Sequence, residues 1–383
     1  LGAGDPESAG EVLAWLASGR TLGDPGSHAP VVVDYPAAGQ RVVYVVTHDG
    51  LLHAFDAATG IENWAWLPRD LLPRLARLMR DEPTTVRDHG IDGPLVLHRF
   101  DPDGDGHIDT AVGEHLWLMF GLGRGGNHYY ALDISSADDP RLAWSVSLPS
   151  MADVESRAMP VITRLAIAES GQSAGDWVVL LAGGYDRQFD SAGSVSSGAG
   201  NSLHLLDAVT GRTLWWSSAD SDADLAVPQL TASLPSAPRA LDLDGDGRLD
   251  RAYVADIGGG LWRFDFSDGR HADELAAARL LARLGTGEQR FHATPDVSLA
   301  ALAGRSQIAI ATGSGWLARP RNTTIIDRIS VVFDREPAGG TRVLTEADLF
   351  DATDGVAAMP ASSPGWFRRL DHRGPGEKVI GAP

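Results

Sequence analysis

The stretch VVYVVTHDGLLHAFDAATGIENWAW, residues 42–66, decides the fold. It alternates runs of β-branched and aromatic residues with an Asp-Gly and a Thr-Gly turn, a pattern that predicts three antiparallel strands. Residues 200–217, GNSLHLLDAVTGRTLWWS, repeat its second half with the same D-x-x-T-G-x-x-x-W spacing. The matching residues are Asp56, Thr59, Gly60 and Trp64 in the first copy and Asp207, Thr210, Gly211 and Trp215 in the second.

Three looser copies extend this repeat along the chain, at residues 126–144, 258–269 and 308–320. In the repeated unit Asp can accept hydrogen bonds from turn amides, Gly permits a positive φ, and Trp covers an edge. One unit alone would leave its faces exposed, so several must pack radially. The sequence therefore predicts an all-β fold, a modified β-propeller of about seven blades at about 40 to 50 residues each, with helical and loop insertions.

The domain boundaries follow from where this pattern begins. Residues 1–21 are expected to form an N-terminal helix and lead-in, because Glu7–Ser18 has an amphipathic helical pattern. Residues 22–383 are expected to form the propeller domain. The segment DLLPRLARLMRD, residues 70–81, predicts a short helix inserted between strands.

The composition excludes several classes of function. With 51 acidic and 32 basic residues the chain has a formal net charge of -19, which repels phosphate backbones and anionic lipid surfaces. No apolar run approaches the ~20 residues of a membrane-spanning helix. We therefore expect no nucleic-acid partner and no membrane insertion by this chain. The metalloprotease, phosphate-loop and nucleophile-elbow motifs are also absent, so we expect no enzyme activity.

The stretch DLDGDGRLD, residues 242–250, predicts a Ca²⁺ site. Carboxylates at loop positions 1, 3, 5 and 9 with a glycine at position 6 are typical of an EF-hand loop. The expected ligands are the side chains of Asp242, Asp244, Asp246 and Asp250 and the main-chain carbonyl of Arg248. Position 12 is Tyr253, where an EF-hand has a bidentate glutamate, and a strand-like run follows. We therefore expect an EF-hand-like loop between strands, with an empty acidic turn as the alternative.

The stretch DPDGDGHID, residues 101–109, repeats the pattern and predicts a second Ca²⁺ site. The expected ligands are the side chains of Asp101, Asp103, Asp105 and Asp109 and the carbonyl of His107. The His107 side chain is expected to face solvent, because position 7 of such loops offers its carbonyl. A solvated acidic hairpin is the alternative for this stretch.

These segments together resemble the C-terminal propeller of the PilY/PilC family of type IV pilus biogenesis and tip adhesin proteins. The segments are LGDPGSHAPVVV (22–33), VYVVTHDGLLHAFDAATG (43–60), FGLGRGGNHYYALDIS (120–135) and LDLDGDGRLDRAYVADIGGGLWRFDFSD (241–268). The resemblance implies that the loop at 242–250 holds calcium, whereas the loop at 101–109 is not a general feature of the family. Because GEKVIGAP at 376–383 resembles the start of a final strand pair, the last blade is expected to be incomplete.

The resemblance also implies a function. It indicates an exported protein at the pilus tip, the outer membrane surface or the periplasm, with its signal peptide outside this stretch. Such a protein promotes pilus assembly and opposes retraction in a Ca²⁺-dependent way, and it supports twitching motility and surface adhesion. Its expected partners are minor pilins at the pilus tip and a host or abiotic surface.

Two other functions remain open from the residues. The D-x-x-T-G-x-x-x-W repeats are also similar to the tryptophan-docking repeats of quinoprotein dehydrogenases, whose propellers bind pyrroloquinoline quinone. Those enzymes commonly place a pair of adjacent cysteines over the cofactor, and this chain has none. The third possibility is an integrin-like propeller whose acidic loops serve only stability, although no Arg-Gly-Asp tripeptide occurs.

Overall fold

A computed structural model describes most of the chain. The described residues are 6–18, 22–26, 28–80, 89–148, 154–173, 175–191, 193, 198–302, 304–335, 341–371 and 374–381. They form two compact units, one of residues 1–147 with 155–159 and one of residues 148–154 with 160–383.

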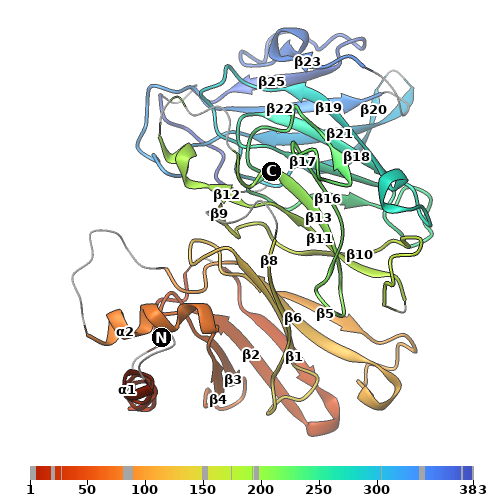
Figure 1. Ribbon diagram of the computed structural model, residues 1–383. Helices are drawn as coiled ribbons and strands as arrows, with labels where there is room; N and C mark the ends of the chain where they lie inside the picture. The colour runs from red at the N-terminus through yellow and green to blue at the C-terminus, as the bar shows by residue number, and fades with distance from the viewer. Residues whose placement is uncertain are drawn as a thin grey trace. The chain divides into compact units, whose positions relative to one another are not determined.

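The first unit contains two helices and two four-stranded antiparallel sheets (Figure 1). The helices are α1 (Pro6–Ala17) and α2 (Leu72–Met79). The first sheet consists of β1 (Val31–Tyr35), β2 (Gln40–Val46), β3 (Leu52–Asp56) and β4 (Glu62–Trp66), and the second of β5 (Val96–Phe100), β6 (His115–Gly121), β7 (His128–Asp133) and β8 (Arg141–Ser147). Neighbours in the chain are neighbours in each sheet, as expected of short strands joined by tight turns.

Both predicted helices are confirmed. They pack against each other through the buried residues Val12, Leu75 and Ala76, which pair the apolar faces of α1 and α2. The second helix is shorter than its predicted range, because the 3₁₀ turn Arg69–Leu71 precedes it. The last predicted residue, Asp81, lies outside the described residues.

The second unit contains three five-stranded sheets. The first of these sheets consists, in order, of β10 (Val161–Arg164), β11 (Trp177–Ala182), β13 (Ser202–Asp207), β14 (Thr213–Ser218) and β15 (Leu225–Ala226). The second consists of β16 (Arg239–Leu241), β17 (Arg251–Ala255), β18 (Gly260–Phe266), β19 (Ala276–Arg283) and β23 (Leu344–Thr345). The third consists of β20 (Asp296–Leu302), β21 (Arg305–Gly313), β22 (Arg328–Asp334), β25 (Gly365–Arg369) and β24 (Phe350–Asp351). In each sheet the edge strand of two residues pairs in parallel. Strand β12 (Tyr185–Asp186) also lies in this unit, whereas the two residues of β9 (Val154–Glu155) are divided between the two units.

Each copy of the sequence repeat lies in its own sheet, and the all-β propeller prediction is confirmed. Three hairpins share one irregularity: Trp64 faces Ala54, Trp144 faces Ala131 and Trp215 faces Leu205, and in each the register shifts directly after that pair. A bulge at the same point of three hairpins is what a repeated unit requires. Chain length predicts about seven blades, and the described residues form five sheets of four or five strands.

The turn chemistry of the repeat is the same in both strict copies. Oδ1 of Asp56 accepts hydrogen bonds from the amide (2.7 Å) and the hydroxyl (2.7 Å) of Thr59. Oδ1 of Asp207 accepts the same two bonds from Thr210, at 2.9 and 3.0 Å. The carboxylate therefore satisfies the turn amide that the strands leave unpaired.

The repeat tryptophans reach a neighbouring sheet of the same unit. In the first unit Nε1 of Trp64 donates to the carbonyl of Ala137 (2.8 Å), in the connection between β7 and β8. In the second unit the buried Trp215 ring meets Phe266 of β18 edge-on, with centroids 5.6 Å apart. Edge-to-face pairs of this kind add to the free energy gained by burial. The repeat therefore encodes sheet-to-sheet packing as well as the turn.

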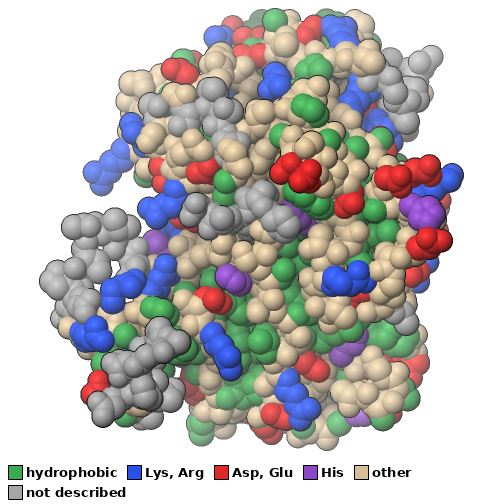
Figure 2. Space-filling model, in the orientation of Figure 1, with side chains coloured by type: hydrophobic (Ala, Val, Ile, Leu, Met, Phe, Trp, Pro, Cys, Tyr) green, Lys and Arg blue, Asp and Glu red, His purple; other side chains and the backbone are tan. Residues whose placement is uncertain are grey.

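The surface is acidic but mixed. On the face shown in Figure 2, acidic side chains lie in small groups with Lys and Arg between them. No helix in the described ranges has the length and apolarity needed to span a membrane.

Candidate metal-binding loops

The loop of residues 242–250 connects β16 to β17 and is folded around Asp242. Its two carboxylate oxygens accept hydrogen bonds from the amides of Gly245 and Gly247, each at 2.7 Å. Both glycines have positive φ, +86° and +82°, which side chains rarely adopt, so glycine is needed for these amides to turn inward. The hydrogen bonds from Gly247 and Gly245 hold the pKa of Asp242 below its usual value. Asp242 is therefore an ionised carboxylate at neutral pH.

Three of the predicted ligands lie together in this loop. One carboxylate oxygen each from Asp242, Asp244 and Asp246 lies within 4.8 Å of the others, and all three residues are exposed. Asp244 and Asp246 accept from the amides two residues further on, at 3.1 and 2.8 Å. Each carboxylate is thus oriented by its own Asx turn, with further lone pairs left for a cation.

The other two predicted residues lie beside this group. Asp250 is not part of the three-carboxylate group, but its Oδ2 accepts the amide of Leu243 at 2.5 Å, which holds it across the start of the loop. Strand β17 begins directly afterwards, and Tyr253 at position 12 is fully buried. The prediction of a loop set between strands is therefore confirmed.

The side chain of Arg248 has a role that the sequence did not indicate. Its guanidinium donates to Oδ2 of Asp176 (2.7 Å) and to Oδ1 of Asp268 (2.9 Å), both within the second unit. The hydrogen bond to Asp176 is the main cause that raises the pKa of Arg248, and Asp268 raises it further. Burial lowers this pKa, but its effect is smaller. Asp268 also accepts the amide of Ala166 at 2.7 Å. One side chain therefore ties the loop to two neighbouring connections.

The loop of residues 101–109 connects β5 to β6 and has the same internal pattern. Asp101 accepts from the amides of Gly104 (2.9 Å) and Gly106 (3.1 Å). The carboxylates of Asp101, Asp103 and Asp105 again lie within 4.8 Å of one another. The two nonapeptides therefore fold alike around their first carboxylate although they lie in different units.

In chain order, residues 101–109 are the first loop and residues 242–250 the second loop. The C-terminal end of the first loop differs from that of the second. Asp109 accepts the amide of Ala111 at 2.9 Å and caps the 3₁₀ turn Thr110–Val112. The buried Glu114 accepts the amide of Asp109 at 2.8 Å, and this residue was not among the sequence candidates. Asp109 is therefore directed away from the start of the loop, and the His107 side chain is exposed, as expected.

Repeated antiparallel sheets with bulged hairpins and inter-sheet tryptophans, together with acidic loops between strands, define a β-propeller protein with candidate cation loops. A family model described as the PilY1 beta-propeller domain matches residues 10–291. The chain therefore belongs to the PilY1 beta-propeller domain family.

Curated relatives agree with this assignment, and a solved structure shares the fold. The type IV pilus biogenesis factor PilY1 homolog of Xylella fastidiosa is 28% identical over 343 residues, covering 86% of this chain and 25% of the relative. PilY1 of Pseudomonas aeruginosa strain PAO1 is 30% identical over 273 residues, 68% of this chain and 21% of the relative. The crystal structure of the Pseudomonas aeruginosa PilY1 C-terminal domain has a TM-score of 0.63 at 23% identity, covering 90% of this chain and 75% of that one. The chain spans about a quarter or less of these curated relatives.

Proposed function

We propose that this propeller is a calcium-binding module of the type IV pilus machinery. In this proposal it promotes pilus assembly and opposes retraction when Ca²⁺ is bound, and it supports twitching motility and surface adhesion. Membership of the PilY1 propeller family, whose relatives are type IV pilus biogenesis factors, supports the pilus role. The role is one of binding, not catalysis.

The proposal of calcium binding rests on one observation: the two acidic loops adopt the same conformation around their first carboxylate and cluster three carboxylates each. Three ionisable carboxylates held within 4.8 Å repel one another, and a bound cation relieves this repulsion. Ca²⁺ takes six to eight oxygen ligands in flexible geometry. In the second loop, Asp242, Asp244, Asp246, Asp250 and the Arg248 carbonyl would supply them together with water.

Loop anchoring gives calcium a route to a partner surface. Because Arg248 joins the second loop to Asp176 and Asp268, ordering of the loop by Ca²⁺ also orders two adjacent connections. Beside the first loop a surface pocket of about 290 Å³ is lined by Asp34, Tyr35 and His107, among others. The pocket beside the first loop and the surface of the two connections beside the second loop would each change when the neighbouring loop binds Ca²⁺.

The proposed partners are minor pilins at the pilus tip and a host or abiotic surface. The proposed location is outside the cytoplasm, at the pilus tip, the outer membrane surface or the periplasm. A pull-down from the envelope of the source organism, with and without chelator, tests this. Recovery of pilins only when Ca²⁺ is present supports the proposal, and equal recovery under both conditions contradicts the calcium dependence.

The variant Asp250→Ala, placed in the full-length protein in cells, tests the regulatory role. It should lower Ca²⁺ affinity while export continues, and it should alter pilus extension or retraction. Asp222→Ala is the matched control, because Asp222 is an exposed acidic residue of another loop. Unchanged piliation and twitching, with loss of Ca²⁺ demonstrated, would show that the ion is only structural.

The quinoprotein alternative has its own test. A propeller that binds pyrroloquinoline quinone should change the absorbance of added quinone and retain it through gel filtration. We expect no binding, since the family assignment favours a pilus role. Stoichiometric retention of quinone would contradict that assignment of function.

A further inference from the structure

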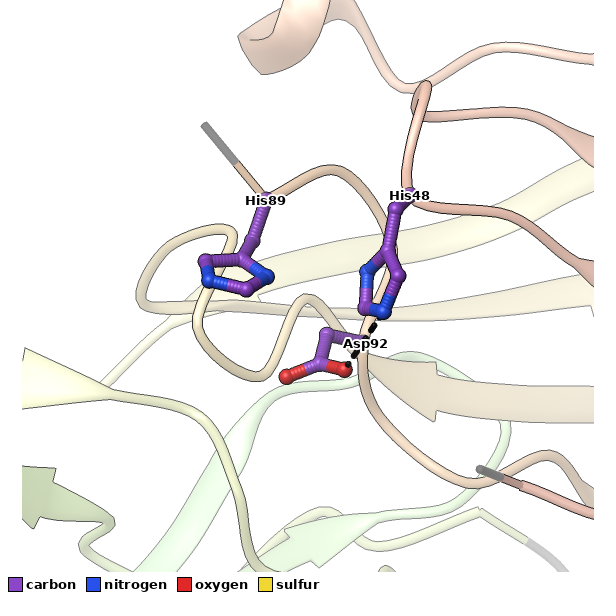
Figure 3. A group of neighbouring side chains, drawn as sticks. All are labelled: His48, His89 and Asp92. Atoms are coloured by element: carbon purple, nitrogen blue, oxygen red, sulfur yellow. Dashed lines mark ion pairs between the residues drawn. The ribbon is translucent and has the colours of Figure 1, made fainter. Parts of the chain in front are cut away.

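Two histidines and an aspartate meet in the first unit, and none of them belongs to the acidic loops. Figure 3 shows His48 and His89 on either side of the Asp92 carboxylate. His48 lies in the turn between β2 and β3, whereas His89 and Asp92 lie in the segment before β5. One ligand atom from each of the three residues lies within 4.8 Å of the other two.

His48 has an unusual environment for a buried imidazole. Its side chain is 9% exposed, and its Nδ1 has no hydrogen-bond partner in the part of the chain that the structure describes. Its Nε2 lies 3.6 Å from Oδ1 of Asp92, which is beyond hydrogen-bond length. A buried polar side chain normally has its hydrogen bonds satisfied. A metal ion bound at Nδ1 would provide that nitrogen with its missing partner, beside the Asp92 carboxylate.

Backbone hydrogen bonds hold the segments that carry His48 and Asp92. The amide of His48 donates to the carbonyl of Asp24 (2.8 Å), and the amide of Asp92 donates to the carbonyl of Leu122 (3.0 Å). The two ligand-bearing segments also touch directly, since a Cβ on Gly90 would lie 2.2 Å from the backbone nitrogen of Gly50. Such a fixed arrangement reduces the ordering that metal binding requires.

The guanidinium of Arg124 also contacts the Asp92 carboxylate. Its Nη2 donates to Oδ1 of Asp92 at 3.0 Å, and its Nε pairs with Oδ2. A carboxylate oxygen that accepts one bond keeps a second lone pair, so Asp92 can bind a cation while it contacts Arg124. The positive charge of Arg124 opposes that cation, and the Arg124 side chain is 41% exposed to solvent. Arg124 is therefore a competitor that mutagenesis can remove.

We propose that His48, His89 and Asp92 form a site for a divalent transition-metal ion of the zinc class. Two imidazole nitrogens and one carboxylate oxygen suit Zn²⁺, which binds at about 2.0–2.2 Å to such atoms in tetrahedral geometry. Three protein ligands leave the fourth position to water. The site is independent of the proposed calcium loops, whose ligands are all oxygen atoms and suit a hard cation.

Zinc calorimetry at saturating Ca²⁺ tests the proposal on the 383-residue chain. We expect one Zn²⁺ per chain. His48→Ala and His89→Ala should each weaken binding by more than the ~10- to 100-fold loss typical of removing a residue that only supports a ligand. Arg124→Gln should tighten binding several-fold, because it removes the opposing charge while Asp92 remains.

Two controls make the outcome unambiguous. His271→Ala removes an exposed histidine of the second unit and should leave zinc affinity unchanged. The double variant Asp101→Ala/Asp242→Ala should also keep its zinc. Zinc binding that survives His48→Ala and His89→Ala, or that disappears in the acidic-loop double variant, would overturn the site.

A spectroscopic measurement covers the case in which a histidine variant fails to fold. X-ray absorption at the zinc edge of the unmutated chain, loaded with one Zn²⁺, should show two imidazoles in the coordination sphere. An all-oxygen sphere would contradict the proposal without any mutation.

Discussion

The amide of Leu243 donates a hydrogen bond to Oδ2 of Asp250 at 2.5 Å, and this bond distinguishes the two acidic loops. The corresponding residue of the first loop is Pro102, which has no N–H to donate. The carboxylate at position 9 of that loop, Asp109, caps the following 3₁₀ turn instead. The loops therefore share three clustered carboxylates and differ in the placement of the fourth.

Leu243→Pro should make the second loop resemble the first, because proline at this position has no amide N–H for Asp250. Without the amide, Asp250 loses its tether, and we expect Ca²⁺ affinity to fall by about tenfold, equivalent to ~1.4 kcal/mol. The fold should persist, because Pro102 occupies the same position in the first loop. Leu243→Ala keeps the amide and removes only a half-exposed side chain, so its affinity should match the unmutated chain. Calorimetry of both variants decides whether the bond matters.

Arg248→Lys tests the anchoring of the loop. Lysine keeps the charge and the main-chain carbonyl but cannot bridge Asp176 and Asp268 together. We expect a stability loss of roughly 1 kcal/mol or less, since these partners are partly exposed, with Ca²⁺ affinity lowered several-fold. Arg270→Lys is the control, because its pair with Glu274 is exposed on both sides. Equal effects of the two variants in urea unfolding and calorimetry would contradict the anchoring role.

Asp207→Ala should destabilise the chain more than Asp56→Ala. Asp207 is fully buried and also accepts the amide of Ser173 at 2.6 Å, whereas Asp56 serves only its own turn. Removing Asp207 leaves partly buried amides, including that of Ser173, unpaired, at a cost of about 2 kcal/mol. Urea unfolding measures the difference. A larger loss for Asp56→Ala would mean that the turn, not its buried contacts, governs stability.

Acidification below pH 6.5 should destabilise the chain through its buried histidines. Burial lowers the pKa of His204 to about 3 and, together with the charge of His115, lowers that of His98 to about 4. The unfolded chain takes up these protons near pH 6.5, so the contribution of each histidine is complete above that value and is lost as the pH falls toward its folded pKa. Between pH 7.5 and pH 5.5, each of the two histidines should lower the free energy of unfolding by about 1 kcal/mol.

His204→Gln isolates one of these contributions. Glutamine is neutral throughout this range and can still reach the hydroxyl of Ser202, which the imidazole contacts at 2.8 Å. The pH slope of urea unfolding should become shallower in this variant. An unchanged slope would show that His204 is not the titrating group.

Local signals carried most of what the sequence revealed. The turn at Asp56, the turn at Asp207 and the folding of both acidic loops depend on hydrogen bonds between residues a few positions apart. Short-range bonds of this kind follow from residue type and spacing, so the repeat and the three clustered carboxylates of each loop could be predicted. Pro102 is a sequence signal that Asp109 differs, because proline has no N–H to donate to the carboxylate at position 9.

Long-range contacts could not be predicted in the same way. The partners of Arg248 come from two other connections, and Asp92 meets His48 only because separate segments pack together. Which surface residues meet depends on the packing of whole sheets, for which one sequence offers no spacing rule. The side-chain role of Arg248 and the cluster around Asp92 therefore became visible only in three dimensions.

Calcium calorimetry of the purified chain, with Mg²⁺ as the comparison ion, tests the central claim most directly. We predict one or two Ca²⁺ bound in the micromolar to millimolar range, because neither loop has the position-12 glutamate that strengthens sensor sites. Mg²⁺ should compete poorly because it demands strict octahedral geometry. Asp101→Ala/Asp242→Ala should abolish the calcium signal. No heat with Ca²⁺, equal affinity for Mg²⁺, or an unchanged signal in that double variant would contradict the assignment of these loops as calcium sites.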